Sequence, residues 1–219
     1  MNQKKQLLRN TIIIAIGKLS TQVISFLLLP LYTGKLSPEQ YGSYDFMVTL
    51  SVFLLPIVTL LMEESMFRFL IDAETVKQRK KVITATAFYM IFGTIAFTVI
   101  AGIVMAIIKY QYGALFIAFV ISNVLLNLSN CLSRGEGKIK LYSLSNFILG
   151  ASTIILNIIF ILPLKMGVNG LLLSNTIANT ATAIIVLKQL KVRKYINKQS
   201  LSRKTLSQMV RYSVPLVPN

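Results

Sequence analysis

The stretch VITATAFYMIFGTIAFTVIAGIVMAII, residues 82–108, is a run of 27 residues without a charge. A helix of that length is about 40 Å long, whereas a hydrocarbon core about 30 Å thick needs roughly 20 apolar residues. Five further apolar runs are each about 20 residues or longer. The expected membrane-spanning segments are 11–32, 42–64, 82–108, 113–133, 141–164 and 167–187. The sequence therefore predicts an all-α polytopic membrane protein, a bundle of six transmembrane helices.

The basic residues predict how these segments are oriented. When the segments are threaded alternately from an inner N-terminus, 19 of the 23 Lys and Arg residues fall on one side. The other side receives Lys35, Lys109 and Lys165, and Lys18 lies within the first segment. Basic residues that flank membrane segments stay in the cytoplasm. We therefore expect an inner-membrane protein with a cytoplasmic N-terminus.

Composition argues against several other classes of protein. With 54% hydrophobic residues and a mean hydropathy of +0.67, the chain is too apolar for a soluble domain. The net charge of +16 lies in membrane-flanking connections, so we expect membrane lipids rather than nucleic acid as its partner. With no His and a single cysteine, Cys131, neither a His-based metal site nor an internal disulfide is possible. We expect no metal, no cofactor and no catalytic residue, and Cys131 is expected to pack in its helix.

Polar residues recur on single faces of the expected helices. Asn123, Asn127, Asn130 and Arg134 follow an i, i+4, i+7, i+11 spacing, which places them within about 60° of one another. Similar faces are formed by Asn146, Gly150, Thr153 and Asn157, by Asn175, Asn179 and Thr182, and by Thr11, Ala15, Lys18, Gln22 and Ser25. Each amide could simply join two helices, at about 0.6 kcal/mol per hydrogen bond. Several converging faces instead predict a bundle with a polar, hydrated interior.

Charged residues inside membrane segments require a partner or a cavity. Lys18 costs about 2.5–3.5 kcal/mol at mid-helix, so it should face the interior or an acid unless it snorkels to the inner surface. In the second segment Asp45, Thr49, Pro56 and Glu63 lie near a common line, and Pro56 is expected to kink the helix and to permit gating.

Two further patterns surround the inner end of the second segment. Glu64 and Arg68 have the spacing and the order of a helical ion pair, which could equally be an interfacial pair that ends the helix. Thr75 and Gln78 have the spacing of a capping box that starts the third helix. The third segment carries few polar residues, so we expect it at the periphery of the bundle.

Three motifs resemble a known family. They are PLYT at 30–33 with LSPEQYGSYD at 36–45, ESMFRF at 64–69, and YSVPLVPN at 212–219. Together with Gly17-Lys18, they resemble the bacterial polysaccharide-biosynthesis flippases. These are the O-antigen and capsule-type lipid-linked oligosaccharide translocases of the multidrug/oligosaccharidyl-lipid/polysaccharide exporter superfamily.

The resemblance implies two six-helix lobes around a central cavity in the bacterial cytoplasmic membrane. Residues 1–187 would form the N-terminal lobe, 188–206 a basic cytoplasmic connection and 207–219 the truncated start of a seventh helix, with the C-terminal lobe missing. The implied function is translocation of an undecaprenyl-pyrophosphate-linked oligosaccharide by alternating access.

The implied substrate assigns roles to the polar residues. Lys18, Arg68 and Arg134 are candidates to bind the diphosphate, and Gln22, Asn123, Asn127, Asn146 and Asn157 to bind the sugars. Asp45, Pro56, Glu63 and Glu64 are candidates for ion pairing and gating.

Three alternatives remain. A multidrug extruder of the same superfamily would favour an acidic cavity, whereas the acids here lie at the helix ends. A membrane enzyme should show clustered acids in a cytoplasmic loop, but Asp72, Glu74 and Glu136 are scattered among bases. A truncated lobe could also act as a scaffold that does not transport.

Overall fold

The computed structural model describes residues 11–12, 26, 28–30 and 32–217. Five helices in this part of the chain are long and apolar enough to cross a membrane. They are α2 (Pro38–Thr59), α4 (Val76–Ile108), α5 (Gly113–Gly135), α6 (Ile139–Ile161) and α7 (Gly167–Gln189). Shorter elements are α3 (Met62–Ile71), α8 (Arg203–Ser213) and the 3₁₀ turns η1 (Val192–Lys194), η2 (Lys198–Ser200) and η3 (Val214–Leu216). The all-α membrane fold is confirmed, while most of the first expected segment, 11–32, lies outside the described residues.

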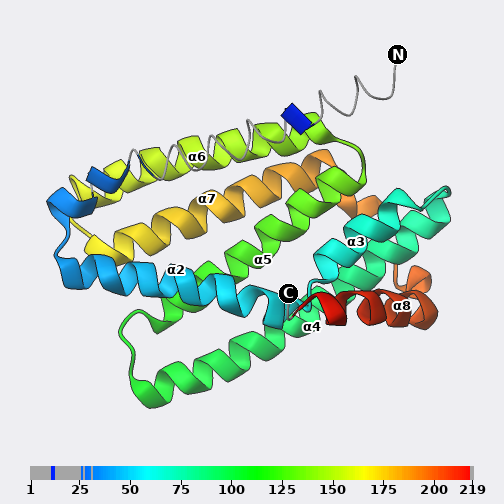
Figure 1. The fold of residues 1–219 in the computed structure, drawn as a ribbon, viewed down its shortest axis with the longest axis horizontal. Coiled ribbons are helices and arrows are strands. Elements are labelled where there is room, and N and C mark those ends of the chain that lie inside the picture. The colour runs from blue at the N-terminus through cyan, green and yellow to red at the C-terminus, as the bar shows by residue number, and fades with distance from the viewer. Residues whose placement is uncertain (1–10, 13–25, 27, 31, 218–219) are drawn as a thin grey trace.

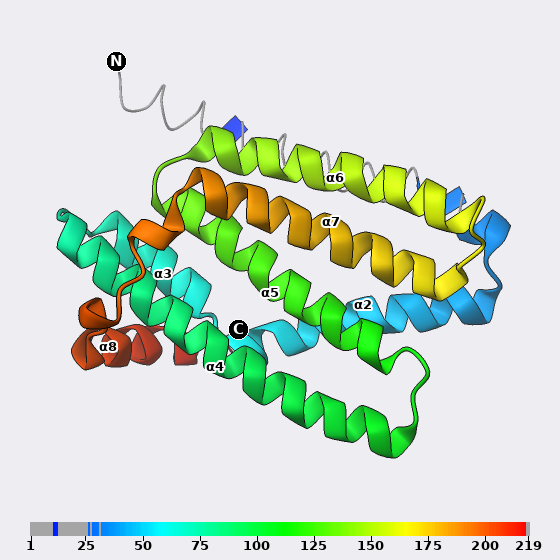
Figure 2. The same ribbon diagram turned by 180° about the vertical axis from the view of Figure 1, so that it is seen from behind.

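Helix α5 occupies the centre of the bundle. Helices α6, α7, α5 and α4 follow one another across the molecule, and α2 packs against α4, α5 and α7 (Figures 1 and 2). Phe116 and Val120 of α5 are almost fully buried, together with Met47 of α2 and Leu172 of α7. These apolar contacts hold α2, α5 and α7 as one packed unit, because interiors of this density tolerate little relative displacement.

Helix α4 is peripheral, as the sequence predicted. Ile91, Ile95, Val99, Ile103 and Ile107 lie at four-residue intervals and are all exposed. A continuous exposed stripe of aliphatic side chains is stable against lipid but not against water. The helix has 33 residues and is about 50 Å long, so it is longer than a bilayer core.

The turns lie alternately at two ends of the bundle. The basic end carries the α3–α4 and α5–α6 turns and the segment after α7, and lies to the right in Figure 1. The opposite end carries the start of α2 and the α4–α5 and α6–α7 turns. Of the Lys and Arg residues in the described part of the chain, only Lys35, Lys109 and Lys165 lie at the opposite end. The helical arrangement thus separates the charges in the way that threading of the sequence predicted.

Capping boxes start two of the membrane helices. In α4 the Gln78 backbone N–H donates to Thr75 Oγ1 over 3.2 Å, and the Thr75 N–H donates to Gln78 Oε1 over 2.9 Å. This confirms the predicted capping box. Ser37 and Gln40 form a second one, with Pro38 in the first position of α2. Helix α2 therefore begins four residues before the expected start at residue 42, because its first turn is satisfied by this cap.

The expected second segment, 42–64, is two helices rather than one kinked helix. Helix α2 continues through Pro56 and ends at Thr59, and α3 begins at Met62. Leu60 and Leu61 separate them with φ values of 45° and 51°. Two consecutive left-handed residues end a helix, at a cost of about 1–2 kcal/mol each. The break between the two helices thus lies at Leu60–Leu61, while Pro56 lies inside α2.

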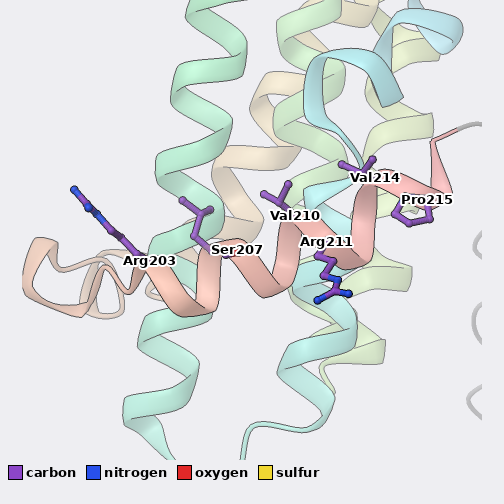
Figure 3. A pocket seen from close by; sticks show the side chains of 7 residues that line it. Arg203, Ser207, Val210, Arg211, Val214 and Pro215 are labelled. Atoms are coloured by element: carbon purple, nitrogen blue, oxygen red, sulfur yellow. The ribbon is translucent and has the colours of Figure 1, made fainter.

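Helix α8 lies across α4 and α3 near the basic end (Figure 3). The Ser65 hydroxyl of α3 donates to the Met209 carbonyl of α8 over 3.1 Å, and both residues are fully buried. Ser202 caps its first turn by accepting from the Thr205 N–H. The expected boundary between the basic connection and a seventh helix, at 206/207, lies inside α8.

Candidate functional site

Glu64, Cys131 and Arg134 form a polar cluster between α3 and α5. Arg134 Nη2 donates to Glu64 Oε1 over 3.0 Å and also lies 3.0 Å from Cys131 Sγ. The guanidinium carbon lies 4.8 Å from the ring centre of Phe67 and 5.7 Å from that of Tyr142 on α6. Aromatic faces stabilise a partly desolvated guanidinium. Arg134 therefore joins α3, α5 and α6 while its charge is balanced by Glu64.

The expected ion pair between Glu64 and Arg68 is wrong. Arg68 instead pairs with Asp72 over 2.6 Å, and both of these side chains are at least half exposed. Glu64 turns towards Arg134, where a less solvated cation with two aromatic neighbours competes successfully for its carboxylate. Cys131 is buried, as expected, but it contacts this cluster rather than packing only among apolar side chains.

Glu63 is a buried carboxyl without a cationic partner in the part of the chain that the structure describes. It is 2% exposed, and its Oε2 has no hydrogen-bond partner among those residues. Its Oε1 lies 3.2 Å from Thr59 Oγ1, which also lies 3.0 Å from the Leu55 carbonyl and 3.1 Å from the Leu61 N–H. A hydroxyl has one proton and two lone pairs.

A protonated Glu63 satisfies all three contacts of the Thr59 hydroxyl. Thr59 then donates to Leu55 and accepts from both Leu61 and Glu63. Burial raises the pKa of Glu63, which lies in α3 and outside the five candidate spans. Geometry and desolvation thus both favour the neutral carboxyl at the break between α2 and α3.

Several predicted sugar-binding amides join helices to one another or to their own backbone. Asn157 Nδ2 donates to the Tyr32 hydroxyl over 3.0 Å. Asn123 Oδ1 accepts from Asn179 Nδ2 over 3.0 Å. Asn146 Nδ2 donates to the Tyr142 carbonyl of its own helix over 2.8 Å. Interhelical hydrogen bonding thus accounts for the Asn157 nitrogen and the Asn123 oxygen, while the buried Asn157 Oδ1 has no partner among the described residues.

Asn127 differs from these amides. It is half-buried, and it has no hydrogen-bond partner among the described residues. Its neighbours on the same face of α5, Asn123 and Asn130, are also half-buried, whereas Val124 and Leu126 on other faces are buried. The predicted stripe is therefore one partly open face of α5, and Asn127 has its full amide capacity available there.

Asp45 lies on the surface of a candidate membrane span. It is exposed and forms no ion pair with any described residue, and Thr49, one turn further along α2, is exposed too. A carboxylate is very costly in hydrocarbon. This face of α2 therefore fits contact with water or protein rather than with lipid.

Some residues of the site could not be recognised from the sequence, and others cannot be placed. Lys18 and Gln22 lie outside the described residues. The hydroxyl groups of Tyr32, Tyr44 and Thr59 take part in the polar contacts, although none stands in a polar stripe. The two tyrosines could have been noticed in the sequence because they belong to the PLYT and LSPEQYGSYD motifs.

Comparison with known proteins identifies the family. The family model "Polysaccharide biosynthesis protein" matches residues 7–219. No curated protein matches the chain. The fold is similar to that of an outward-facing multidrug resistance MATE family transporter of the MOP superfamily, with a TM-score of 0.79 at 18% identity over 100% of this chain and 53% of that chain.

Two further solved structures show the same fold. A MATE protein in the straight conformation has a TM-score of 0.75 at 22% identity, over 100% of this chain and 53% of that one. A MATE protein in the bent conformation has a TM-score of 0.71 at 20% identity, over 99% and 53%. The chain thus spans about half the length of these transporters. It is a multi-pass membrane protein that belongs to the polysaccharide biosynthesis protein family.

Proposed function

We propose that this chain forms one lobe of a flippase that moves an undecaprenyl-pyrophosphate-linked oligosaccharide from the cytoplasmic to the outer leaflet of the bacterial inner membrane. The observation that carries the proposal is the family match, which extends over nearly the whole chain. The process is binding and conformational change, and it requires no covalent chemistry.

The partly open face of α5 suits the sugar portion of this substrate. Sugar hydroxyls both donate and accept hydrogen bonds, and an amide offers both kinds of partner. Asn127 and the Asn123 amide nitrogen face no competing partner among the described residues. They are the residues of the stripe best able to bind sugar without loss of an internal hydrogen bond.

Arg134 lies one helical turn beyond Asn130 on the same face and suits the diphosphate. Arginine binds phosphate in a bidentate geometry, and the diphosphate carries more charge than one carboxylate. Binding would therefore exchange Glu64 for the diphosphate at Arg134 and loosen the contact between α3 and α5. Arg68 is already paired and more exposed, so we assign it a secondary role.

Transport would require a second lobe of similar size. The matching solved chains are about twice as long as this one, and Asp45 lies on a face that is unsuited to lipid. Alternating access would occur by movement of the two lobes around the substrate, and the break at Leu60–Leu61 supplies a hinge between α2 and α3.

A multidrug extruder is the second candidate, and Asp45 is the observation that favours it. An exposed carboxylate without a cationic partner in the described chain could bind a drug cation. One of the solved structures with this fold is a multidrug resistance transporter by name.

A liposome assay separates the two functions. The protein, together with a separately produced second lobe, is reconstituted with fluorescent undecaprenyl-pyrophosphate oligosaccharide, and dithionite quenching reports translocation. Parallel liposomes are tested for transport of ethidium. We expect translocation of the lipid-linked sugar that falls at least tenfold in Asn127→Ala and no transport of ethidium. Ethidium transport that depends on Asp45, without movement of the sugar, would establish the second candidate instead.

A further inference from the structure

A small cavity lies at the opposite end of the lobe, away from the α5 stripe. Its volume is about 250 Å³, and it lies between the start of α2 and the α6–α7 turn. Lys35, Gln40, Lys165 and Gly167 supply its polar lining, and Leu36 and Leu162 are among its apolar walls. The proposed function assigns no role to any of these residues.

The charge of this cavity is unusual for its place in the protein. Only three described basic residues lie at the opposite end, and two of them, Lys35 and Lys165, line the cavity. No carboxylate of the described chain lines it, and neither lysine forms an ion pair with a described residue. The nearby Glu39 is exposed and is likewise unpaired in the described chain. Two like charges at one cavity repel each other, and a bound anion relieves that repulsion.

Gln40 adds a fixed hydrogen-bond donor. Its Oε1 accepts from the Ser37 N–H over 3.1 Å as part of the cap of α2, which fixes the orientation of the amide. Gln40 Nε2 lies beside Gly167, so that a Cβ added to this glycine would come within 3.3 Å of the nitrogen. The nitrogen has no acceptor among the described residues. Gly167 has a φ of +55°, a conformation that suits glycine.

The α6–α7 turn fixes the backbone of Lys165, while the Lys165 and Lys35 side chains are exposed. Lys165 has a φ of 50°, and the Met166 N–H donates to the Phe160 carbonyl over 3.0 Å across the turn. A non-glycine residue keeps this conformation only where the surrounding structure enforces it. The polar side chains that line the cavity in the described chain thus come from two separate segments, and none of them is acidic.

The size and the walls of the cavity indicate the ligand. At about 250 Å³ it lies below the roughly 300–1,000 Å³ typical of drug-sized ligands, so it fits a headgroup rather than a sugar chain. Amines and an amide donor beside apolar walls suit a phosphate attached to a hydrocarbon chain. We propose that this cavity binds the phosphate or diphosphate group of a lipid on the outer side of the membrane. The assignment to the outer side rests on the orientation in the proposed function.

Two lipids share this chemistry, and a binding experiment distinguishes them. The purified chain in uncharged detergent is titrated with undecaprenyl diphosphate, with phosphatidylglycerol and with uncharged polyprenol, and affinity is measured by microscale thermophoresis. The variant Lys35→Gln/Lys165→Gln should lose at least tenfold in affinity for the phosphate-bearing lipids. The control Lys109→Gln/Lys188→Gln removes two exposed charges outside the cavity and should stay within twofold of the parent.

The outcomes separate this proposal from the proposed function. Stronger lysine-dependent binding of undecaprenyl diphosphate identifies the translocated substrate as the ligand, and comparable binding of both lipids identifies a general headgroup site. Equal affinity of the two double variants, or equal binding of polyprenol, overturns the cavity proposal. If undecaprenyl diphosphate binds independently of the lysines, only the cavity is excluded. If phosphatidylglycerol binds through the two lysines and undecaprenyl diphosphate does not bind at all, the cavity proposal is supported and the proposed function is contradicted.

Discussion

Arg134 of α5 donates to Glu64 of α3 over 3.0 Å, although the two residues are 70 positions apart in the sequence. The contact fixes the helix that follows the break at Leu60–Leu61 against the central helix of the bundle. It also places a balanced charge pair on the same face of α5 as the Asn127 amide, which has no partner among the described residues. In the proposed function, substrate binding and the position of α3 would be linked through this one guanidinium.

Arg134→Ala should destabilise the protein because Glu64 loses its partner and two aromatic rings lose a cation. The Arg134 and Glu64 side chains are 24% and 43% exposed, so solvent screening reduces the effect to about 1–2 kcal/mol. Thermal melting in detergent, followed by circular dichroism, measures the change. Arg68→Ala is the matched control and should have almost no effect, because its pair with Asp72 is exposed. An equal loss in both variants would contradict the assigned pairing.

Glu63→Gln should reduce the pH dependence of stability. Because burial raises the pKa of Glu63 in the folded protein, the unfolded chain loses this proton first as the pH rises. The folded state is therefore destabilised as the pH increases from the ordinary Glu pKa through the raised one. The Glu63→Gln variant lacks this contribution, because its amide does not titrate.

The measurement for Glu63 is the melting temperature at several values between pH 4 and pH 8. We expect Glu63→Gln to gain stability relative to the parent towards neutral pH. Glu39→Gln, at an exposed position in the first turn of α2, is the control for loss of one carboxylate. Parallel curves for the parent and Glu63→Gln would show that Glu63 is not protonated in the folded state.

Asn127→Ala should leave stability unchanged within about 0.5 kcal/mol, because its amide has no partner among the described residues. Asn179→Ala removes two hydrogen bonds between α7 and α5, to Ser122 and Asn123, and should cost about 0.6–1.7 kcal/mol. The rate of translocation of lipid-linked sugar, divided by the amount of folded protein, should fall more in Asn127→Ala than in Asn179→Ala. If Asn127→Ala is strongly destabilised, Asn127 joins helices and is not available to bind sugar.

Orientation can be tested with single cysteines in a Cys131→Ser background. Gln111 lies in the exposed α4–α5 turn and Lys194 in the exposed segment after α7. On intact cells, a membrane-impermeant maleimide should label Gln111→Cys and spare Lys194→Cys, because the basic end is expected in the cytoplasm. The opposite pattern would invert the topology and place the Lys35–Lys165 cavity on the inner side.

The sequence predicted the membrane helices closely because their signal is local. The expected segments 113–133, 141–164 and 167–187 end within a few residues of α5, α6 and α7. Thr75 and Gln78 predicted the start of α4 for the same reason, since a capping box needs only four consecutive residues. The sequence did not indicate the α2–α3 break, because Leu60 and Leu61 are not residues that favour a positive φ.

What the sequence by itself determined was the spacing of the apolar segments that the structure describes, the sorting of the basic residues between two ends and the polar face of α5. Each depends on the periodicity of one helix or on charge next to one apolar run. Only the tertiary structure decided that Glu64 pairs with Arg134 rather than with Arg68, and that Asn157 and Asn179 join helices while Asn127 stays free of partners in the described chain. It also brought Lys35 and Lys165 to one cavity. The physical reason is that these contacts join residues 56 or more positions apart, and their distances are set by how whole helices pack.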